Sequence, residues 1–179
     1  SKGGKIKLYT VVFINNSISP FHCENDETGG GIKVKDFSNF VVMNSSFILN
    51  KAMYGGGIYA ISGGTVKVYR VTFKENLIVD DFGSGGGIRL KHFSKFSVEA
   101  SLFKGNKAVA HNTGSDGAVV DAKSGRIVNI HNVSFINNSL TDDDGEGGGG
   151  IRVSRVSKSF VAFSSFLYNK AGYGGAIYA

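Results

Sequence analysis

Short runs in which apolar and polar residues alternate recur throughout the chain, as in KIKLY, TVKVY and GIYAI. This period of two is typical of β-strands, whereas an amphipathic helix repeats its apolar residues about every 3.6 positions. The runs are rich in Val, Ile, Phe, Tyr and Thr, and Gly, Asn, Asp or Ser bounds each of them. The sequence therefore predicts an all-β protein built from short strands and turns.

A Phe-x-x-Asn element recurs six times and defines an internal repeat. Each copy is followed by a glycine corner that ends in a β-branched residue, as in GGGI or GGAI. Equivalent residues of stacked coils lie about 4.8 Å apart, so both markers predict internal ladders. The ladder residues are Phe13, Phe47, Phe73, Phe103, Phe135 and Phe166, with Asn16, Asn50, Asn76, Asn106, Asn138 and Asn169. The corner residues predict an aliphatic column of Ile32, Ile58, Ile88, Val119, Ile151 and Ile177.

Three short strands with their turns account for roughly 30 residues, which predicts a right-handed parallel β-helix (a solenoid) of about six coils. Two types of lead segment alternate before the Phe, so the unit is a two-coil super-repeat. We expect residues 1–179 to form a single β-helix segment. Its coil markers lie near 13–32, 47–58, 73–88, 103–119, 135–151 and 166–177.

Two distant segments of the chain are nearly identical in sequence. The segment SSFILNKAMYGGGIYA at residues 45–60 nearly reappears as SSFLYNKAGYGGAIYA at residues 164–179. Terminal repeats of a solenoid usually carry a polar cap, and the second of these segments shows none. We therefore expect the chain to be part of a longer repeat array.

The composition narrows the function classes. The chain has a net charge of +6, but its basic residues are scattered, and no nucleic-acid-binding motif accompanies them. No run of about 18–20 apolar residues predicts a membrane-spanning helix. The single cysteine, Cys23, excludes an internal disulfide framework.

Charged residues of alternate copies predict outward contacts. Acidic residues precede the glycine corner, and basic residues follow it on alternating strand positions. We expect an acidic edge beside a basic stripe, suited to self-association or to pairing with neighbouring rods. The candidate contact residues are Asp80, Asp81, Asp142, Asp143, Asp144, Lys33, Lys35, Arg89, Lys91, Arg152 and Arg155.

Enzymatic chemistry has weak support in the sequence. Some parallel β-helices cleave polysaccharides, using paired carboxylates or calcium. The only strand-borne carboxylate near a polar cluster is Asp121, with Asp116, Lys123 and Arg126. Calcium-loop signatures are missing from the acidic segments. We therefore expect no enzyme activity, no cofactor and no metal site, and we keep a polysaccharide lyase or hydrolase as the less favoured alternative.

Four Asn-x-Ser sequons provide candidate glycosylation sites in a secreted eukaryotic protein. They are at Asn15, Asn44, Asn132 and Asn137. The first and last of these occupy the same repeat position, next to a ladder Asn, and should face outward.

The pairing of Phe-x-x-Asn with GGAI, the latter present in full at residues 174–177, resembles the repeat of the chlamydial polymorphic outer membrane proteins. The resemblance implies a parallel β-helix displayed at a cell surface, as in the adhesin passenger of an autotransporter. Taken together, the sequence predicts a non-enzymatic, extracellular or cell-surface rigid rod that forms a structural fibre or stalk. The alternative is an adhesin passenger that contacts a host-cell or polysaccharide surface.

Overall fold

A computed structural model describes residues 3–18, 29–79, 83–109, 118–141 and 147–179. Within these residues the chain forms no helix, and its parallel strands stack as a β-solenoid of about 4 turns with ~31 residues per turn. The predicted all-β parallel solenoid is confirmed, whereas the expected six coils exceed the number of complete turns. In the first and last copies, isolated bridges from Ser17 and Lys170 replace a third strand.

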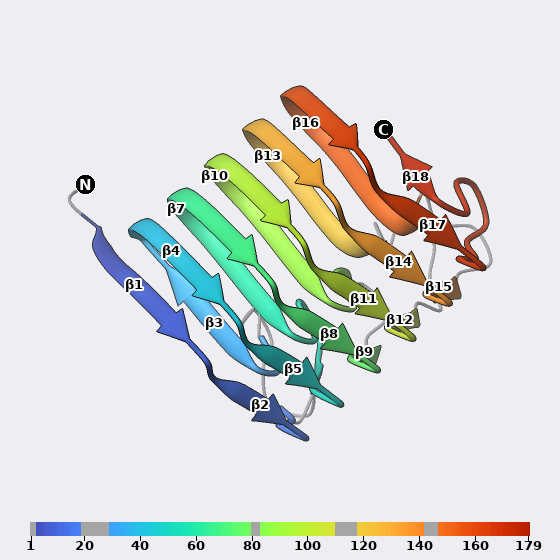
Figure 1. Cartoon of the computed structure of the whole chain (residues 1–179), viewed down its shortest axis with the longest axis horizontal. Helices are drawn as coiled ribbons and strands as arrows, with labels where there is room; N and C mark the ends of the chain where they lie inside the picture. Colours follow the sequence, from blue (N-terminus) through green and yellow to red (C-terminus); the bar gives the residue numbers. More distant parts are fainter. Residues whose placement is uncertain (1–2, 19–28, 80–82, 110–117, 142–146) are drawn as a thin grey trace.

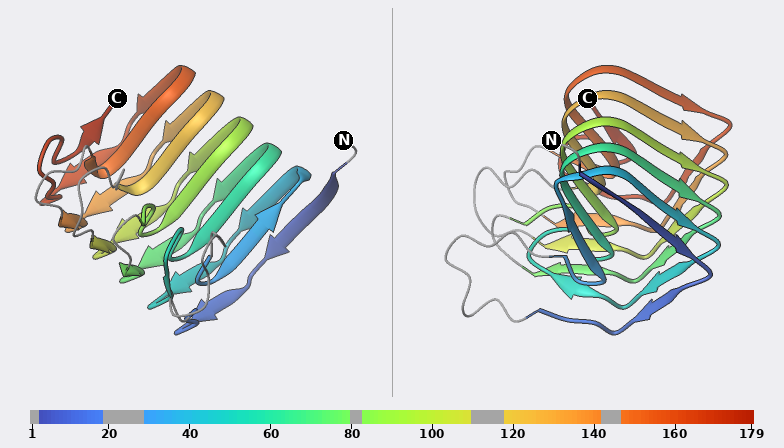
Figure 2. Two further views of the ribbon diagram at one scale, coloured as in Figure 1. Left: turned by 180° about the vertical axis from the view of Figure 1, so that it is seen from behind. Right: turned by 90° about the vertical axis from the view of Figure 1, so that its left-hand side faces the viewer.

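Three parallel sheets run along the solenoid, with successive coils side by side (Figures 1 and 2). Sheet A has the order β1 (Gly4–Tyr9), β4 (Phe37–Met43), β7 (Ile58–Tyr69), β10 (Ile88–Glu99), β13 (Ala118–His131), β16 (Gly148–Ala162) and β18 (Ile177–Tyr178), and β3 (Ile32–Lys35) also pairs with β7. Sheet B contains β2 (Val12–Ile14), β5 (Ser46–Ile48), β8 (Thr72–Lys74), β11 (Leu102–Lys104), β14 (Ser134–Ile136) and β17 (Ser165–Leu167). Sheet C contains β6 (Lys51–Ala52), β9 (Leu77–Val79), β12 (Lys107–Val109) and β15 (Ser139–Thr141).

The corners between sheets use a residue in the left-handed conformation, and most of these residues are not glycine. Between sheets A and B the φ angles range from 48° to 55°. These corner residues are Thr10, Asn44, Arg70, Ala100, Asn132 and Phe163. Such a conformation costs roughly 1–2 kcal/mol per non-glycine residue. Hydrogen bonds between coils offset this cost, since the backbone N–H of Asn44 donates to Tyr69 O at 3.0 Å.

The six repeat phenylalanines form one continuous stack in the interior. Neighbouring ring centroids are 4.6–5.0 Å apart, and the ring planes deviate by 0–9°. The four inner rings, from Phe47 to Phe135, are fully buried. Burial of each ring contributes about 1.5–3 kcal/mol, and the regular stacking favours the register in which each Phe lies over the next.

The six repeat asparagines form a second ladder at the corner that follows sheet B. The backbone N–H and the side-chain amide of Asn50 both donate to Asn76 Oδ1, each at 3.0 Å. The Asn50 amide also donates to the carbonyl oxygen of Phe13 in the preceding coil, at 3.0 Å. The same pattern continues through Asn106 and Asn138 to Asn169. Each inner Asn therefore bonds to the coils on both sides.

The two-coil super-repeat has a packing explanation in sheet A. Phe93 is in register with Gly63 on one side and Gly125 on the other. A Cβ atom on Gly63 would lie 2.0 Å from Cζ of Phe37, and one on Gly125 would lie 2.2 Å from Cζ of Phe93. The aromatic ring of one coil thus fills the space that glycine leaves in the next, so large and small residues must alternate.

Candidate functional site: a charged column beside the glycine corner

The residue directly after each corner position belongs to one column on the outer face of sheet A. Register pairs join its members in the order Lys33, Tyr59, Arg89, Asp121, Arg152 and Tyr178. In this charged column the carboxylate of Asp121 lies between two arginines, one in each adjacent coil. Its composition makes it the strongest candidate for a contact or chemical site.

A one-residue irregularity in the fourth copy brings Asp121 into this column. Ile88 pairs with Val120, which in turn pairs with Ile151, and the ladder is irregular between Ala118 and Val120. The prediction that Val119 continues the aliphatic column is therefore wrong, although Val119 is also buried. Because a shift of one residue exchanges the two faces of a strand, it carries Asp121 to the outer face.

The prediction that the basic residues form accessible contacts is wrong for two of them. Arg89 and Arg152 are only 7% and 4% exposed, so they do not belong to an accessible basic stripe. The arginines are buried because residues that precede the glycine corners pack against them. The guanidinium of Arg89 lies over the ring of Tyr54, with Cζ 4.2 Å from the ring centroid, and it contacts buried Ser84. Strand alternation predicted that these arginines lie on the outer face of sheet A, but it did not predict that other residues pack over them.

Asp121 connects the two arginines in a buried charge cluster, formed by Ser84, Arg89, Asp121 and Arg152. Ser84 donates its hydroxyl hydrogen to Asp121 Oδ2 at 2.8 Å, and Arg89 Nη1 donates to Ser84 Oγ. Arg89 Nε lies 3.9 Å from Asp121 Oδ2, and Arg152 Nη1 lies 3.5 Å from Asp121 Oδ1. The Asp121 side chain is completely buried. A buried charge requires such partners, and here the partners come from adjacent coils.

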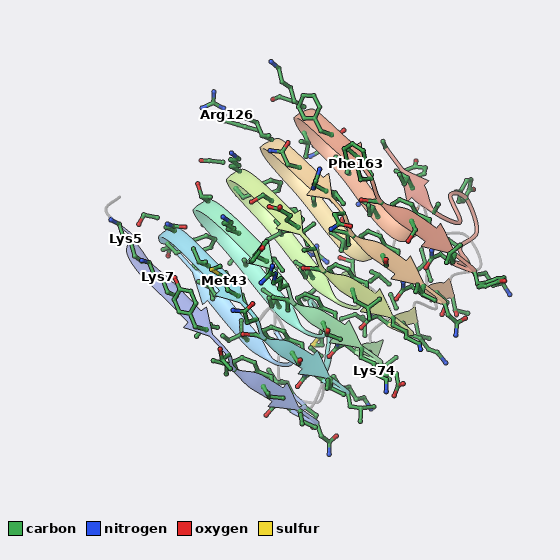
Figure 3. The ribbon with its side chains drawn as sticks, in the orientation of Figure 1. Lys5, Lys7, Met43, Lys74, Arg126 and Phe163 are labelled. Atoms are coloured by element: carbon green, nitrogen blue, oxygen red, sulfur yellow. The ribbon has the colours of Figure 1, made fainter. Side chains whose placement is uncertain are left out.

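The charges of this cluster pair with one another rather than with solvent. Its charges are buried and bound to one another, which suits holding three coils in register rather than binding a substrate. Of the residues expected near Asp121, Lys123 is half-buried on β13, and Arg126 is exposed at the bend of that strand (Figure 3). Asp116 lies outside the described residues. Sequence reasoning missed Ser84, because no local motif distinguishes it from the other serines.

The remaining candidate contact residues divide into two groups. Lys33, Lys35 and Arg155 are exposed, and Lys91 is half-buried on β10. The acidic candidates Asp80, Asp81, Asp142, Asp143 and Asp144 lie outside the described residues. Charge complementarity between an acidic edge and a basic stripe therefore stays a prediction, now carried on the basic side by three exposed residues.

All four sequon asparagines are exposed at corners. Asn44 and Asn132 occupy the corner between sheets A and B, and Asn15 and Asn137 precede the ladder Asn after sheet B. Their φ angles lie between 48° and 54°, a conformation that asparagine tolerates well. Each side chain is thus presented on the outer surface.

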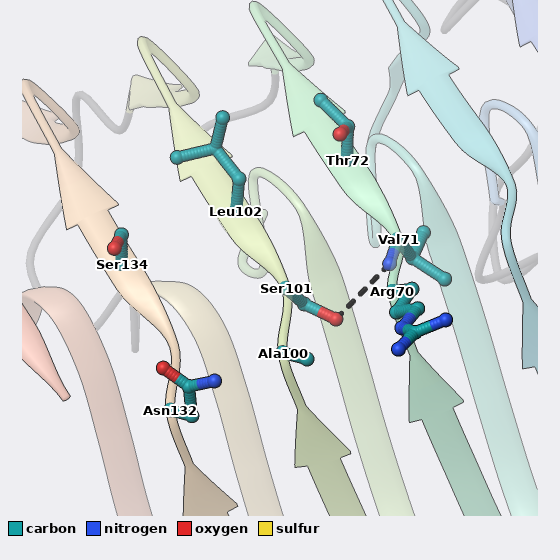
Figure 4. A pocket seen from close by; sticks show the side chains of 8 residues that line it. All are labelled: Arg70, Val71, Thr72, Ala100, Ser101, Leu102, Asn132 and Ser134. Carbon is teal, nitrogen blue, oxygen red and sulfur yellow. Dashed lines mark hydrogen bonds between the residues drawn. The ribbon is translucent and has the colours of Figure 1, made fainter. Parts of the chain in front are cut away.

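A shallow groove of about 350 Å³ crosses three coils at the corner between sheets A and B. Arg70, Ser101 and Asn132 are among its lining residues (Figure 4). The Ser101 hydroxyl is engaged by the corner, since it accepts from Val71 N at 3.1 Å and donates to Glu99 O at 2.8 Å. No carboxylate lines this groove, which is a by-product of the stacked corners.

Among the described residues, no group of three or more His, Cys, Asp or Glu side chains is arranged to hold a metal ion. No helix there has the length and apolar character needed to cross a membrane.

Comparison with known proteins supports the repeat. Residues 163–179 match the family model of the Chlamydia polymorphic membrane protein repeat, so the resemblance is confirmed over that segment. The chain is also 30% identical over 140 residues to the metabotropic glutamate receptor-like protein R of Dictyostelium discoideum. The match covers 78% of this chain and 8% of that protein.

A solved structure of QnrB1, a plasmid-mediated fluoroquinolone resistance protein, aligns with 89% of this chain and 91% of its own chain. The identity is 10% and the TM-score is 0.17. A similarity of this size bears on neither fold nor function.

Proposed function

We propose that this chain is a non-enzymatic rigid rod, a stalk or fibre segment of an extracellular or cell-surface protein. The observation that carries the proposal is the continuity of the two internal ladders. The Phe stack runs from Phe13 to Phe166, and the Asn ladder runs from Asn16 to Asn169. A solenoid bonded in this way resists bending because each coil is fixed to both neighbours.

The comparisons fit a surface location. The matching repeat family takes its name from membrane proteins of Chlamydia, and the Dictyostelium relative is named as a receptor-like protein. The chain spans 8% of that relative's length. As a segment of a much larger protein, a rod would set the distance between other domains or between those domains and a membrane.

The proposed rod function is tested by changing the rod length. Residues 63–124 form a two-coil unit, because Gly63 and Gly125 occupy equivalent positions beside Phe93. Tandem duplication of this unit should lengthen the particle by about 10 Å, the rise of two coils. Small-angle X-ray scattering of monomeric protein measures the maximum dimension. An unchanged length, or a more compact particle, would contradict the rod.

Adhesion is the second candidate, favoured by the match of residues 163–179 to the polymorphic membrane protein repeat. In this alternative, exposed Lys33 and Lys35 on β3 supply contacts to an acidic polysaccharide or cell surface. Beads coated with the chain should bind such a surface, and the variant Lys33→Glu/Lys35→Glu should bind it less. Lys74→Glu, a change at an exposed residue of β8, is the matched control. Equal binding by all three proteins would exclude this contact.

Lateral pairing of rods is the contact proposed for the fibre. The exposed basic residues Lys33, Lys35 and Arg155 of one rod would face acidic residues of another. Surface ion pairs are individually weak and screened by salt, so the pairing requires several of them. Reversal of Asp142, Asp143 and Asp144 to Lys should weaken association at low salt without changing the melting temperature. Sedimentation at two ionic strengths measures this effect.

A further inference from the structure

The outer face of sheet C carries one column in which lysine alternates with uncharged residues. Its strands lie side by side along the solenoid (Figure 1). Register pairs and isolated bridges join the members in the order Ser17, Lys51, Leu77, Lys107, Ser139 and Lys170. All three lysines are exposed. Because every second coil contributes one, neighbouring members of this lysine ladder (Lys51, Lys107 and Lys170) are about 9.6 Å apart.

The two-coil repeat explains why the lysines keep this spacing. An Asn-Lys-Ala triplet occurs in each even copy, at residues 50–52, 106–108 and 169–171. The alanine points inward, and buried Ala108 pairs with the larger side chains of Ile78 and Leu140 in the odd copies on either side. Since successive side chains of a strand point to opposite faces, the lysine before each alanine points outward.

The Asn ladder fixes the backbone of the lysine ladder. The backbone N–H of Lys107 donates to Asn76 O at 2.9 Å, and that of Lys170 donates to Asn138 O at 2.9 Å. Within the described part of the chain, none of the three ammonium groups forms an ion pair. The strands of sheet C in that part contain no acidic residue. The ladder therefore presents positive charges at a fixed spacing without neutralising side chains.

A straight row of separate positive charges is complementary to a linear polyanion. The two-coil spacing suits a polysaccharide with an anionic group on every second sugar, because a disaccharide has a similar length. The hydroxyl groups of Ser17 and Ser139, which alternate with the lysines, can exchange hydrogen bonds with sugar hydroxyls. Duplex DNA instead carries one charge per ~1.7 Å of its axis. Single-stranded nucleic acids are bound by stacking on aromatic side chains, and this column contains none.

We propose that the lysine ladder binds a linear acidic polysaccharide, which lies along the solenoid axis with an anionic group against each lysine. This site goes beyond the rod function and is separate from the contact at Lys33 and Lys35. Exposed ion pairs are individually weak, so the affinity depends on how many form at once. Lys51 and Lys170 are four coils apart, about 19 Å. A hexasaccharide, with three disaccharide units, is therefore needed to engage the whole ladder.

Fluorescence anisotropy with labelled chondroitin sulfate oligosaccharides tests the ladder. Affinity should rise about threefold from four sugars to six, the effect of one more exposed ion pair, and change little from six to eight. For the hexasaccharide, Lys51→Gln/Lys107→Gln/Lys170→Gln should lower the affinity roughly thirty-fold. Lys5→Gln/Lys67→Gln/Lys95→Gln removes the same charge from exposed positions on sheet A and should stay within about twofold of wild type. Both variants should keep the wild-type melting temperature.

An exchange of two register partners tests the spacing itself. Leu77 and Lys107 are paired in adjacent coils, so Leu77→Lys/Lys107→Leu keeps the composition and the net charge of the chain. The three charges of the column would then be separated by one coil and by three coils. This variant should bind the hexasaccharide about threefold more weakly than wild type or worse, because one ion pair is lost.

Equal losses in the two glutamine variants, or wild-type affinity in the exchanged variant, would overturn the ladder. A single-stranded DNA of equal charge that binds as tightly as the hexasaccharide, and loses affinity in the same variants, would overturn the assignment to a polysaccharide.

The duplicated rod separates this site from the rod function. Its repeated residues 63–124 include Lys107, so it gains a fourth ladder lysine and should bind an octasaccharide about threefold more tightly than wild type does. A particle of the expected greater length without this gain would overturn the ladder and leave the rod function intact.

Discussion

The Nη1 atom of Arg152 lies 3.5 Å from the Oδ1 atom of Asp121, and both side chains are buried in the wall of the solenoid. The two residues belong to successive coils and meet only because the fourth copy contains a one-residue irregularity. Together with Arg89 they place two positive charges around one negative charge. The cluster thus links three coils by interactions that require one register.

Removal of the central charge should destabilise the protein. Asp121→Asn leaves two buried guanidiniums without their carboxylate, and loss of one partner from a buried ion pair costs about 3–5 kcal/mol. Urea unfolding measures the free energy of unfolding. Glu75→Gln, which alters an exposed pair with Lys74, should change it by less than about 1 kcal/mol.

The same experiment has an internal check. Replacing all three charged residues with apolar ones (Arg89→Met/Asp121→Leu/Arg152→Met) should recover much of the stability lost in Asp121→Asn, because no unpaired charge remains buried. A triple variant as unstable as Asp121→Asn would mean that lost packing, rather than unpaired charge, explains the single variant.

Interruption of the Asn ladder should have a larger effect in the middle than at the end. The side chain of Asn76 accepts two hydrogen bonds from Asn50 and donates to Asn106 Oδ1 and Phe47 O. Asn76→Leu leaves several buried groups unsatisfied, each costing about 1–3 kcal/mol, so a loss of about 3 kcal/mol or more is expected.

Asn16→Leu is the matched control for the ladder. The side chain of Asn16 is exposed and donates to Asn50 Oδ1, so its loss should cost about 1 kcal/mol. Thermal unfolding of dilute, monomeric samples compares the two variants. Equal melting temperatures would show that the ladder adds nothing beyond a local turn.

The Phe stack should respond to truncation according to burial. Phe73 is fully buried between Phe47 and Phe103, and Phe73→Ala should destabilise the fold by about 3–5 kcal/mol. Phe163 is 84% exposed, and Phe163→Ala should change stability by about 0.5 kcal/mol or less. Alanine suits the conformation of that corner, since Ala100 occupies the equivalent position. Calorimetry of both variants checks the contrast.

The alternation of Phe and Gly in sheet A can be tested with one methyl group. Gly63→Ala places a Cβ atom 2.0 Å from the ring of Phe37, and such overpacking costs about 1–3 kcal/mol. Gly4→Ala meets nothing within 4 Å and should be close to neutral.

A rescue experiment identifies the cause of the Gly63→Ala effect. Phe37→Leu removes the far end of the ring, so the double variant Phe37→Leu/Gly63→Ala should lose less stability than the sum of the two single variants. Additive losses would indicate that Gly63 is needed for its backbone rather than for the space it leaves.

The exposed sequon asparagines at the corners between strands predict glycosylation. When the chain is secreted from a eukaryotic host, Asn44 and Asn132 should carry glycans, because both side chains are exposed at corners. Enzymatic deglycosylation should reduce the mass, and Asn44→Gln/Asn132→Gln should abolish that part of the shift. An unmodified mass for the secreted wild-type chain would exclude modification at these sites.

The repeat alone was enough to predict the sheet class and the members of the Phe and Asn columns. Identical residues at nearly constant spacing must stack when each repeat forms one coil, so Phe73 and Asn76 could be placed in the interior without coordinates. The number of complete turns was predicted less well, because the first and last copies carry the Phe and Asn markers but form only isolated bridges in place of a strand of sheet C.

The sequence pattern did not show which residues from other coils cover a given side chain, and only the tertiary structure decided this. Strand alternation placed Arg89 and Arg152 on the outer face, but only the fold brings Tyr54 and Ser84 against Arg89. The irregularity beside Val119 places Asp121 on the outer rather than the inner face of sheet A. A single sequence does not show where such an irregularity in strand pairing occurs. Leu49 and Ala100 adopt left-handed corners because hydrogen bonds between coils impose a conformation that these residues do not prefer. Periodicity thus determines which residues stack, whereas the contacts between coils determine which of them are covered.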